Sequence, residues 1–149
     1  MTDKRIAKRP PDSLFQLVTD QWTEPFWDAA REKRLVCAQC SDCGHKRMPP
    51  TPFCPTCRSQ RIDWIELPGG GVVYAYTIVE RGTLPSMEDC LPYVPAVIEP
   101  DNGGGARLIS NIVDSRVADI AVGARVDIVF DTLAKGALVP RFRLLGFGK

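Results

Sequence analysis

The pattern of apolar and polar positions changes its period near residue 35. Before this point, a Ser-x-x-Gln capping box followed by apolar residues at helical spacing predicts a short helix over residues 13–21. Thr23 as an N-cap, with a carboxylate and a proline in the next turn, predicts a second helix that ends near Glu32 or Lys33. Beyond residue 35, alternating and β-branched runs take over, so the sequence predicts a mainly β chain with short N-terminal helices.

Three large aromatic side chains fall within or between the predicted helices. Two short helices cannot bury three such rings between themselves, so the rings either pack on the rest of the chain or dock on another protein. Exposed apolar patches of this size are typical of contact surfaces. The candidate residues of a partner interface are Trp22, Phe26 and Trp27.

Apolar runs after residue 35 predict two strands before the glycine-rich stretch at Gly69 and five strands after it. The two earlier runs cover 35–39 and 61–67. The five later runs cover residues 72–79, 93–99, 107–113, 125–130 and 138–145. A helical or looped link separates the third of these five strands from the fourth. Five strands in about 75 residues, with a break after the third, predict a small closed barrel of the OB type.

Two Cys-x-x-Cys pairs, Cys40 with Cys43 and Cys54 with Cys57, stand ten residues apart and give the strongest signal in the chain. Each pair places two thiolates on one side of a tight backbone turn, a knuckle. Two facing knuckles supply the tetrahedral set of four sulfurs that Zn²⁺ prefers. We expect these four cysteines to bind a structural zinc ion.

A second ligand set is possible, because Cys37 and Cys40 also form a Cys-x-x-Cys pair. We favour Cys43 because Gly44 follows it, and the residue after a knuckle often needs a positive φ. Cys37 is then a buried strand residue. His45, the only histidine, neighbours the site but is not needed as a ligand, and the lone thiol of Cys90 has no base near it in the sequence.

These elements divide the chain into four parts. They are a flexible tail over 1–12, N-terminal helices over 13–34, a zinc ribbon over 35–67 and an OB-fold domain over 68–149. The tail is basic and lacks apolar periodicity, which favours a solvated terminus over an electrostatic docking arm.

Composition and charge narrow the functional classes. The 149 residues are 44% hydrophobic and 25% charged, with no apolar run near the ~20 residues of a membrane span. The first residues lack the apolar core of a secretory signal, so a reducing, cytoplasmic location with zinc explains six cysteines better than disulfides. Residues 68–149 carry 8 basic against 9 acidic side chains, which disfavours the alternative of a nucleic-acid-binding ribbon and OB module.

The chain resembles the small zinc-ribbon OB-fold proteins of acyl-CoA metabolism, catalogued as a domain of unknown function. The resemblance covers roughly residue 20 to the end. It rests on the ordered set Pro25-Phe26-Trp27, Cys40-x-x-Cys43-Gly44, Pro49-Pro50, Cys54-Pro55-x-Cys57, Trp64, Gly69 to Val73, Pro92-Tyr93-Val94, Ile112-Val113-Asp114 and Gly123-x-x-Val126. It implies N-terminal helices, a rubredoxin-like zinc ribbon and a C-terminal OB-fold. Cys37 is an extra cysteine relative to this pattern.

The resemblance also implies a role as the small subunit that accompanies a thiolase-like enzyme: a thiolase, an acyltransferase or an aldolase. The partner would carry the catalytic residues, and this chain would hold a hetero-oligomer together and shape the acyl-CoA entrance. The strand-rich half agrees, since it has no histidine and no clustered carboxylates. Cations that could meet CoA phosphates at a shared site are Arg31, Lys33, Arg34, Lys46 and Arg47.

Overall fold

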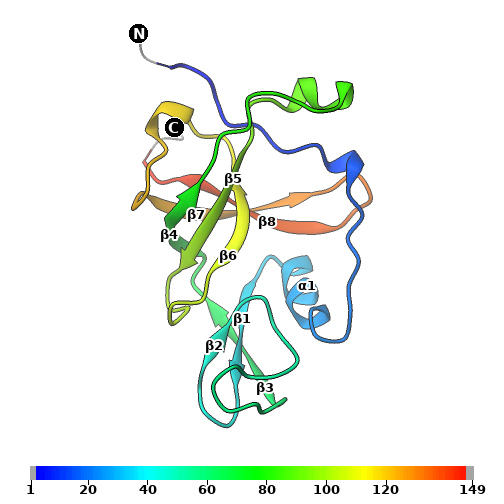
Figure 1. The fold of residues 1–149 in the computed structure, drawn as a ribbon, viewed down its shortest axis with the longest axis vertical. Helices are drawn as coiled ribbons and strands as arrows, with labels where there is room; N and C mark the ends of the chain where they lie inside the picture. Colours follow the sequence, from blue (N-terminus) through cyan, green and yellow to red (C-terminus); the bar gives the residue numbers. More distant parts are fainter. Residues whose placement is uncertain (1–2, 147–149) are drawn as a thin grey trace.

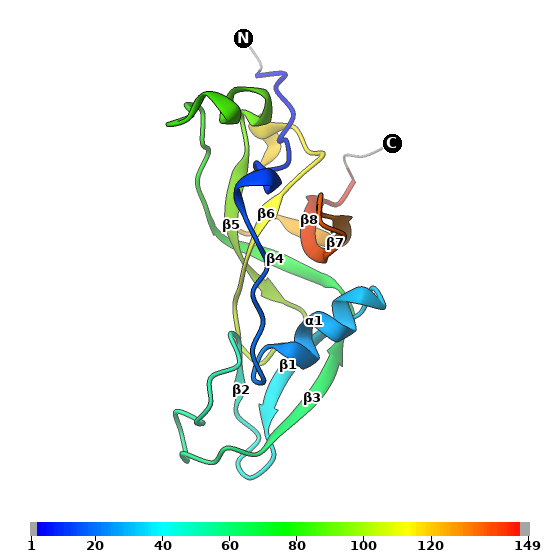
Figure 2. The same ribbon diagram turned by 90° about the vertical axis from the view of Figure 1, so that its right-hand side faces the viewer.

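A computed structural model describes residues 3–146 as a zinc-ribbon sheet and a closed barrel, with one helix between them. The ribbon lies at one end of the molecule and the barrel at the other (Figure 1). Seen from the side, α1 lies where the two parts meet (Figure 2). The predicted mainly β architecture is confirmed. No helix among residues 3–146 is long and apolar enough to cross a membrane.

The only α-helix of residues 3–146, α1 (Glu24–Arg31), matches the second predicted helix. Thr23 occupies the N-cap position, but its side chain makes no capping hydrogen bond. Oδ1 of Asp20 instead accepts the backbone N–H groups of Trp22 at 2.9 Å and of Thr23 at 2.8 Å, in the turn that precedes the helix. The helix therefore begins where the sequence predicts, but the side-chain hydrogen bonds lie in the preceding turn.

The predicted helix over 13–21 is wrong. Only one 3₁₀ turn, η1 (Asp12–Leu14), forms there, and residues 15–20 carry no helix. An isolated helix shorter than about 12–15 residues is marginal unless its apolar face packs on something. Here Phe15 remains 60% exposed and Val18 81% exposed, so no such support exists within the described chain.

The ribbon sheet has the order β2-β1-β3 and is antiparallel throughout. Its strands are β1 (Leu35–Cys40), β2 (Lys46–Arg47) and β3 (Ile62–Leu67). β1 is almost wholly buried because it lies between the other two strands and against α1. Its last residue starts the first cysteine knuckle.

The barrel closes in the order β4-β5-β6-β8-β7. Its five strands are β4 (Gly70–Tyr76), β5 (Val94–Pro100), β6 (Leu108–Ile112), β7 (Arg125–Thr132) and β8 (Leu138–Leu144). The 3₁₀ turn η2 (Pro85–Cys90) follows β4, and η3 (Val117–Asp119) forms the predicted link before β7. The buried core of the barrel consists of Ala7, Val73, Val94, Ala96, Ile98, Ile112, Val117, Ile120, Val126, Phe142 and Leu144.

Residues 3–12, expected to be a flexible tail, instead form an N-terminal strap along the barrel. The backbone N–H of Ala7 donates to the carbonyl of Ser115 at 2.8 Å, and that of Lys8 donates to Pro92 at 2.9 Å. Arg9 binds both Asp114 and Asp131 through its guanidinium group. The strap is thus held by long-range contacts that the local sequence pattern does not reveal.

A second apolar cluster joins the ribbon, α1 and the barrel. Its buried members are Phe26, Ala29, Leu35, Val36, Cys37, Leu67 and Ala106. Leu108 and Ile128 of the barrel pack against it. The base of the ribbon therefore shares a core with the barrel, whereas its far end carries the knuckles.

Candidate metal centre and the adjacent apolar surface

Two backbone turns of the same form present the four predicted cysteines. In the first turn, the N–H of Gly44 donates to the carbonyl of Cys40 at 2.9 Å. In the second, the N–H of Arg58 donates to the carbonyl of Cys54 at 2.8 Å. Gly44 has φ +79° and Arg58 has φ +66°, so the residue after each knuckle is left-handed, as expected for Gly44.

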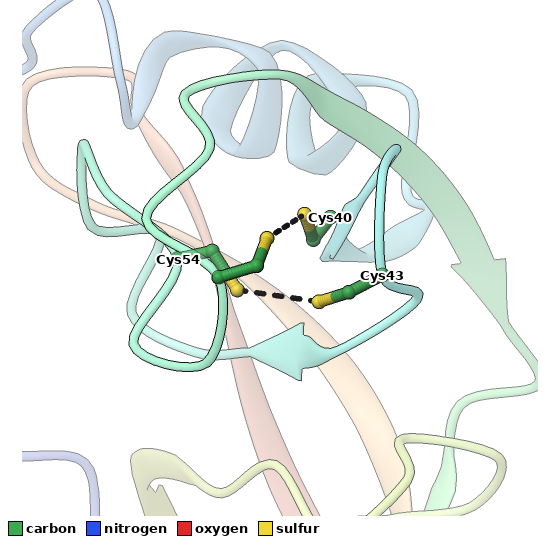
Figure 3. A group of neighbouring side chains, drawn as sticks. Cys40, Cys43 and Cys54 are labelled. Atoms are coloured by element: carbon green, nitrogen blue, oxygen red, sulfur yellow. Dashed lines mark hydrogen bonds between the residues drawn. The ribbon is translucent and has the colours of Figure 1, made fainter.

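The four sulfur atoms form a compact group. All lie within 4.8 Å of one another, and Sγ of Cys40 is 3.5 Å from that of Cys57. Figure 3 shows Cys43 and Cys54 reaching toward each other from the two loops, also at 3.5 Å. Zn–S bonds of about 2.3 Å in a tetrahedron place sulfurs about 3.8 Å apart. The group therefore fits a zinc ion.

The four thiols are too close to ionise independently. Burial opposes ionisation of Cys54, but the N–H groups of Cys57 and Thr56 and the neighbouring thiols outweigh it and lower its pKa to about 6. The N–H of Ser59 favours the Cys57 thiolate, yet the thiol of Cys40, burial and the other thiols raise its pKa to about 12. Binding of a divalent cation would allow all four thiols to ionise, because its charge stabilises all four thiolates together.

The other cysteines and the histidine lie outside this group. Cys37 is fully buried in β1, where burial raises the pKa of its thiol and its Sγ lies 3.6 Å from the carbonyl oxygen of Ala38. His45 is exposed and contributes its backbone carbonyl to the N–H of Cys40 at 2.8 Å. Cys90 is half-buried in η2, in the barrel half of the molecule.

Polar contacts that the sequence did not reveal support the knuckles. Asp42 of the first loop accepts a short hydrogen bond from the hydroxyl of Ser59, and its carboxylate lies 3.2 Å from Arg61. Arg47 is buried and donates to the carbonyl of Thr51 from Nε at 3.1 Å and Nη2 at 2.9 Å. These contacts tie the two loops and the proline-rich segment to β2.

The three predicted interface aromatics have different environments. Phe26 is only 7% exposed and belongs to the apolar cluster at the base of the ribbon. Trp27 is half-buried and meets Phe26 edge-on, with ring centroids 5.0 Å apart and an interplanar angle of 88°. Trp22 is half-buried just before α1. Phe26 therefore mainly anchors the helix and offers a partner far less area than Trp27 does.

Two grooves meet beside Trp27 and form one apolar surface. One has a volume of about 440 Å³ and lies between α1, the segment Met48–Pro50 and the start of β6. The other, of about 430 Å³, continues toward the end of β6 and β8. Both are lined by Phe26, Trp27, Leu108 and Ile109. Ile109 is 80% exposed and was not singled out from the sequence, since one apolar residue in a strand carries no signal of its own.

The cations proposed to meet CoA phosphates are largely engaged within the chain. Arg31 pairs with Asp28, and Arg34 pairs with Glu32 and Glu66. Lys46 Nζ donates to the carbonyl of Asn102 at 2.8 Å, Arg47 is buried, and Lys33 is exposed.

The sequence matches two family models in succession. They are "ChsH2, rubredoxin-like zinc ribbon domain" over residues 27–63 and "ChsH2, C-terminal OB-fold domain" over residues 64–131. A DUF35 domain-containing scaffold protein of Methanocaldococcus jannaschii is 34% identical over 116 residues, which cover 76% of this chain and 80% of that protein.

A longer relative and a solved structure extend the comparison. A probable enoyl-CoA hydratase alpha subunit of Thermomonospora curvata is 38% identical over 102 residues, which cover 68% of this chain but 31% of that protein. The solved structure "Ltp2-ChsH2(DUF35) aldolase" superposes with a TM-score of 0.77 at 31% identity, covering 87% of this chain and 98% of its counterpart. With its four grouped cysteines and closed barrel, the chain belongs to the DUF35 family, in which a rubredoxin-like ribbon with structural zinc precedes an OB-fold.

Proposed function

We propose that this chain is a non-catalytic accessory subunit of a thiolase-like acyl-CoA complex. The partner is a thiolase, an acyltransferase or an aldolase, and the two chains form a hetero-oligomer in the cytoplasm. Family membership supports the proposal, as do the names of relatives: a scaffold protein, a hydratase alpha subunit and an aldolase complex.

We propose that zinc is held by Cys40, Cys43, Cys54 and Cys57. All four positions of a tetrahedral ion are then filled by thiolates, which leaves no open position for a substrate and makes the role structural. The ion fixes the far end of the ribbon, while the apolar cluster at its base fixes α1. Zinc thus keeps the loop that carries Met48–Pro50 in place beside Trp27.

The observation that carries the proposal is the apolar surface around Trp27 and Ile109. It joins elements from the helix, the ribbon loop and the barrel, so it exists only in the folded chain. An isoleucine that is 80% exposed between two apolar grooves is typical of a contact surface.

At the acyl-CoA entrance, we propose that this chain supplies apolar surface rather than phosphate contacts. Most of the candidate cations are already paired or buried, so the partner must provide most of the charge that holds the CoA phosphates. The half-buried indole of Trp27 and the grooves beside it suit the uncharged part of the ligand.

The test is to purify the chain alone and together with the thiolase-like protein encoded beside it. We expect co-elution at a defined stoichiometry and a partner whose C–C bond-forming or bond-cleaving activity falls without this chain. Ile109→Asp should weaken the complex, whereas Val122→Asp, at a position 68% exposed outside both grooves, should not. Failure to co-elute, together with full activity of the partner alone, would show that the proposal is wrong.

A further inference from the structure

Arg47, the last residue of β2, is a buried cation with no anion beside it. The residue is 6% exposed, and none of the ion pairs within residues 3–146 includes it. Its Nη1 is buried and has no hydrogen-bond partner among these residues. Burying a charge that no carboxylate compensates costs stability. The position of Arg47 therefore indicates a role other than stabilising the ribbon.

Both contacts that the Arg47 guanidinium makes go to the loop between the two knuckles. Its Nε and Nη2 donate to the carbonyl of Thr51 at 3.1 Å and 2.9 Å. The hydroxyl of Thr51 donates in turn to the carbonyl of Phe53 at 3.0 Å. Cys54 follows directly, and its N–H donates to the carbonyl of Ser59 at 2.9 Å in the second knuckle. Arg47 and the knuckle thus hold this loop from both sides.

The loop over residues 48–53, here called the ribbon loop, is stiff and uncharged. Pro49, Pro50 and Pro52 restrict φ at three of its six positions, so the loop has little backbone entropy left to lose when it binds. No charged side chain occurs between Arg47 and Arg58. A surface that covers this loop must therefore be largely apolar as well.

The ribbon loop exposes one aromatic ring. Phe53 is 58% exposed and lies outside both grooves. The other end of the loop, Met48–Pro50, lines the groove beside Trp27. The ring thus continues the apolar surface around Trp27 onto the ribbon. Aromatic side chains that are held in place before binding are typical anchors of protein interfaces.

We propose that Arg47 is a positioning residue that holds the ribbon loop in the conformation in which Phe53 inserts into an apolar, uncharged pocket of the partner subunit. This inference rests on the proposed function and adds a second anchor to the interface around Trp27 and Ile109. The cost of burying the Arg47 charge fixes the loop in advance, so more of the free energy from burying the ring is available for affinity.

Continuity with the groove and the lack of charge select this occupant. The ribbon loop forms one wall of the groove beside Trp27, so the chain that fills this groove also meets the loop that carries Phe53. A nucleic acid or an anionic membrane draws its affinity from cations, which the ribbon loop lacks.

Phe53→Ser tests the anchor in the complex with the thiolase-like protein encoded beside this chain. We expect the Kd of the complex to rise at least tenfold while zinc is retained. The matched control is Leu84→Ser, at a position 49% exposed before η2 in the barrel half, which should leave the Kd within about twofold. Unchanged affinity of Phe53→Ser, or loss of its zinc, overturns the anchor but not the accessory role. Absence of a complex with the wild-type chain overturns both.

Arg47→Met separates positioning from stability. Methionine fills a similar volume without charge, so the melting temperature of the zinc-bound chain should stay equal or rise. The amide order parameters of Thr51 and Phe53, measured by ¹⁵N relaxation, should fall from about 0.85 to below about 0.6, and the Kd should rise several-fold. A lower melting temperature or lost zinc would make Arg47 a structural residue instead. Self-association of the chain, or its binding to phosphatidylcholine vesicles, that disappears in Phe53→Ser would assign the ring to another surface and overturn the proposal.

Discussion

The ribbon and the barrel are two small β structures that are held together by different means. The barrel has a core of eleven buried residues, closed by strands on all sides. The far end of the ribbon has no such core: Cys43 and Cys57 are exposed, and β3 is mostly half-buried or exposed. A metal ion therefore stabilises this end of the ribbon, as apolar burial stabilises the barrel.

The boundary between the two means of stabilisation runs through the ribbon itself. Leu35 and Leu67, at its base, are buried in the cluster that includes Phe26 and Ala106. The knuckles stand at the opposite end of the same strands. Loss of zinc should consequently release the loops that carry the knuckles while α1 and the barrel stay folded.

The largest expected effect comes from removing a zinc ligand. Cys40→Ser or Cys57→Ser should lose zinc and unfold the knuckle loops, since structural zinc contributes apparent free energies of about 10–16 kcal/mol in zinc-finger peptides. Zinc content measured by atomic absorption, and amide exchange of the two loops, report the result. Cys37→Ser is the matched control, because Cys37 lies outside the group of four. Equal loss of zinc in all three variants would contradict the ligand assignment.

Truncation of the barrel core should have the next largest effect. It should destabilise the barrel and leave the zinc site intact. Phe142 is fully buried between β6 and β7, and a buried Phe→Ala change costs about 3–5 kcal/mol. Phe142→Ala should lower the free energy of unfolding by this amount in urea denaturation while the chain still binds one zinc. Simultaneous loss of zinc would show that the two parts do not stabilise themselves separately.

Local patterns predicted the features whose causes are local. The knuckles depend on spacing within four residues, and all five barrel strands follow from alternating or β-branched runs. The strap over residues 3–12 could not be predicted, because Arg9 finds Asp114 and Asp131 more than a hundred residues away.

The helix predicted over residues 13–21 is wrong for a different reason: the local signal is present, but the tertiary packing that a helix needs is not. A capping box is a true local signal, but a helix of that length needs a surface to pack on, and Phe15 and Val18 find none. At the next helix, Thr23 occupies the N-cap position but makes no side-chain capping hydrogen bond, and Asp20 stabilises the preceding turn instead. Local signals locate the start of a helix only when tertiary packing completes it.

The two knuckles provide a finer comparison within the ribbon. Gly44 and Arg58 are equivalent positions with φ of +79° and +66°, and only glycine adopts this region without cost. Arg58→Gly should raise the free energy of unfolding of the zinc-bound ribbon by about 1 kcal/mol. Gly44→Ala should lower it by a similar amount, because the added Cβ makes only an ordinary van der Waals contact, 3.8 Å from Nε2 of Gln39, and the backbone strain dominates. Thermal unfolding of the zinc-bound forms measures both, and a loss of stability in Arg58→Gly would mean that the arginine side chain makes a stabilising contact.

The smallest effect concerns the strap, which Arg9 ties to the barrel through ion pairs with Asp114 and Asp131. The side-chain hydrogen bonds from Arg9 lower the pKa of Asp114, outweighing burial, so the folded protein holds this proton less tightly than the unfolded chain. The resulting stabilisation is present above the ordinary Asp pKa of 3.8 and is lost as the pH falls through the lowered value. The side chain of Asp114 is 48% exposed, so solvent screening limits the contribution to below about 1 kcal/mol.

Asp114→Asn should therefore speed the amide exchange of Ala7 and Lys8 at pH 7. It should also abolish the loss of strap stability that the wild type shows below pH 4, while the barrel core stays protected. Unchanged exchange would mean that the backbone hydrogen bonds to Ser115 and Pro92 hold the strap without the ion pair.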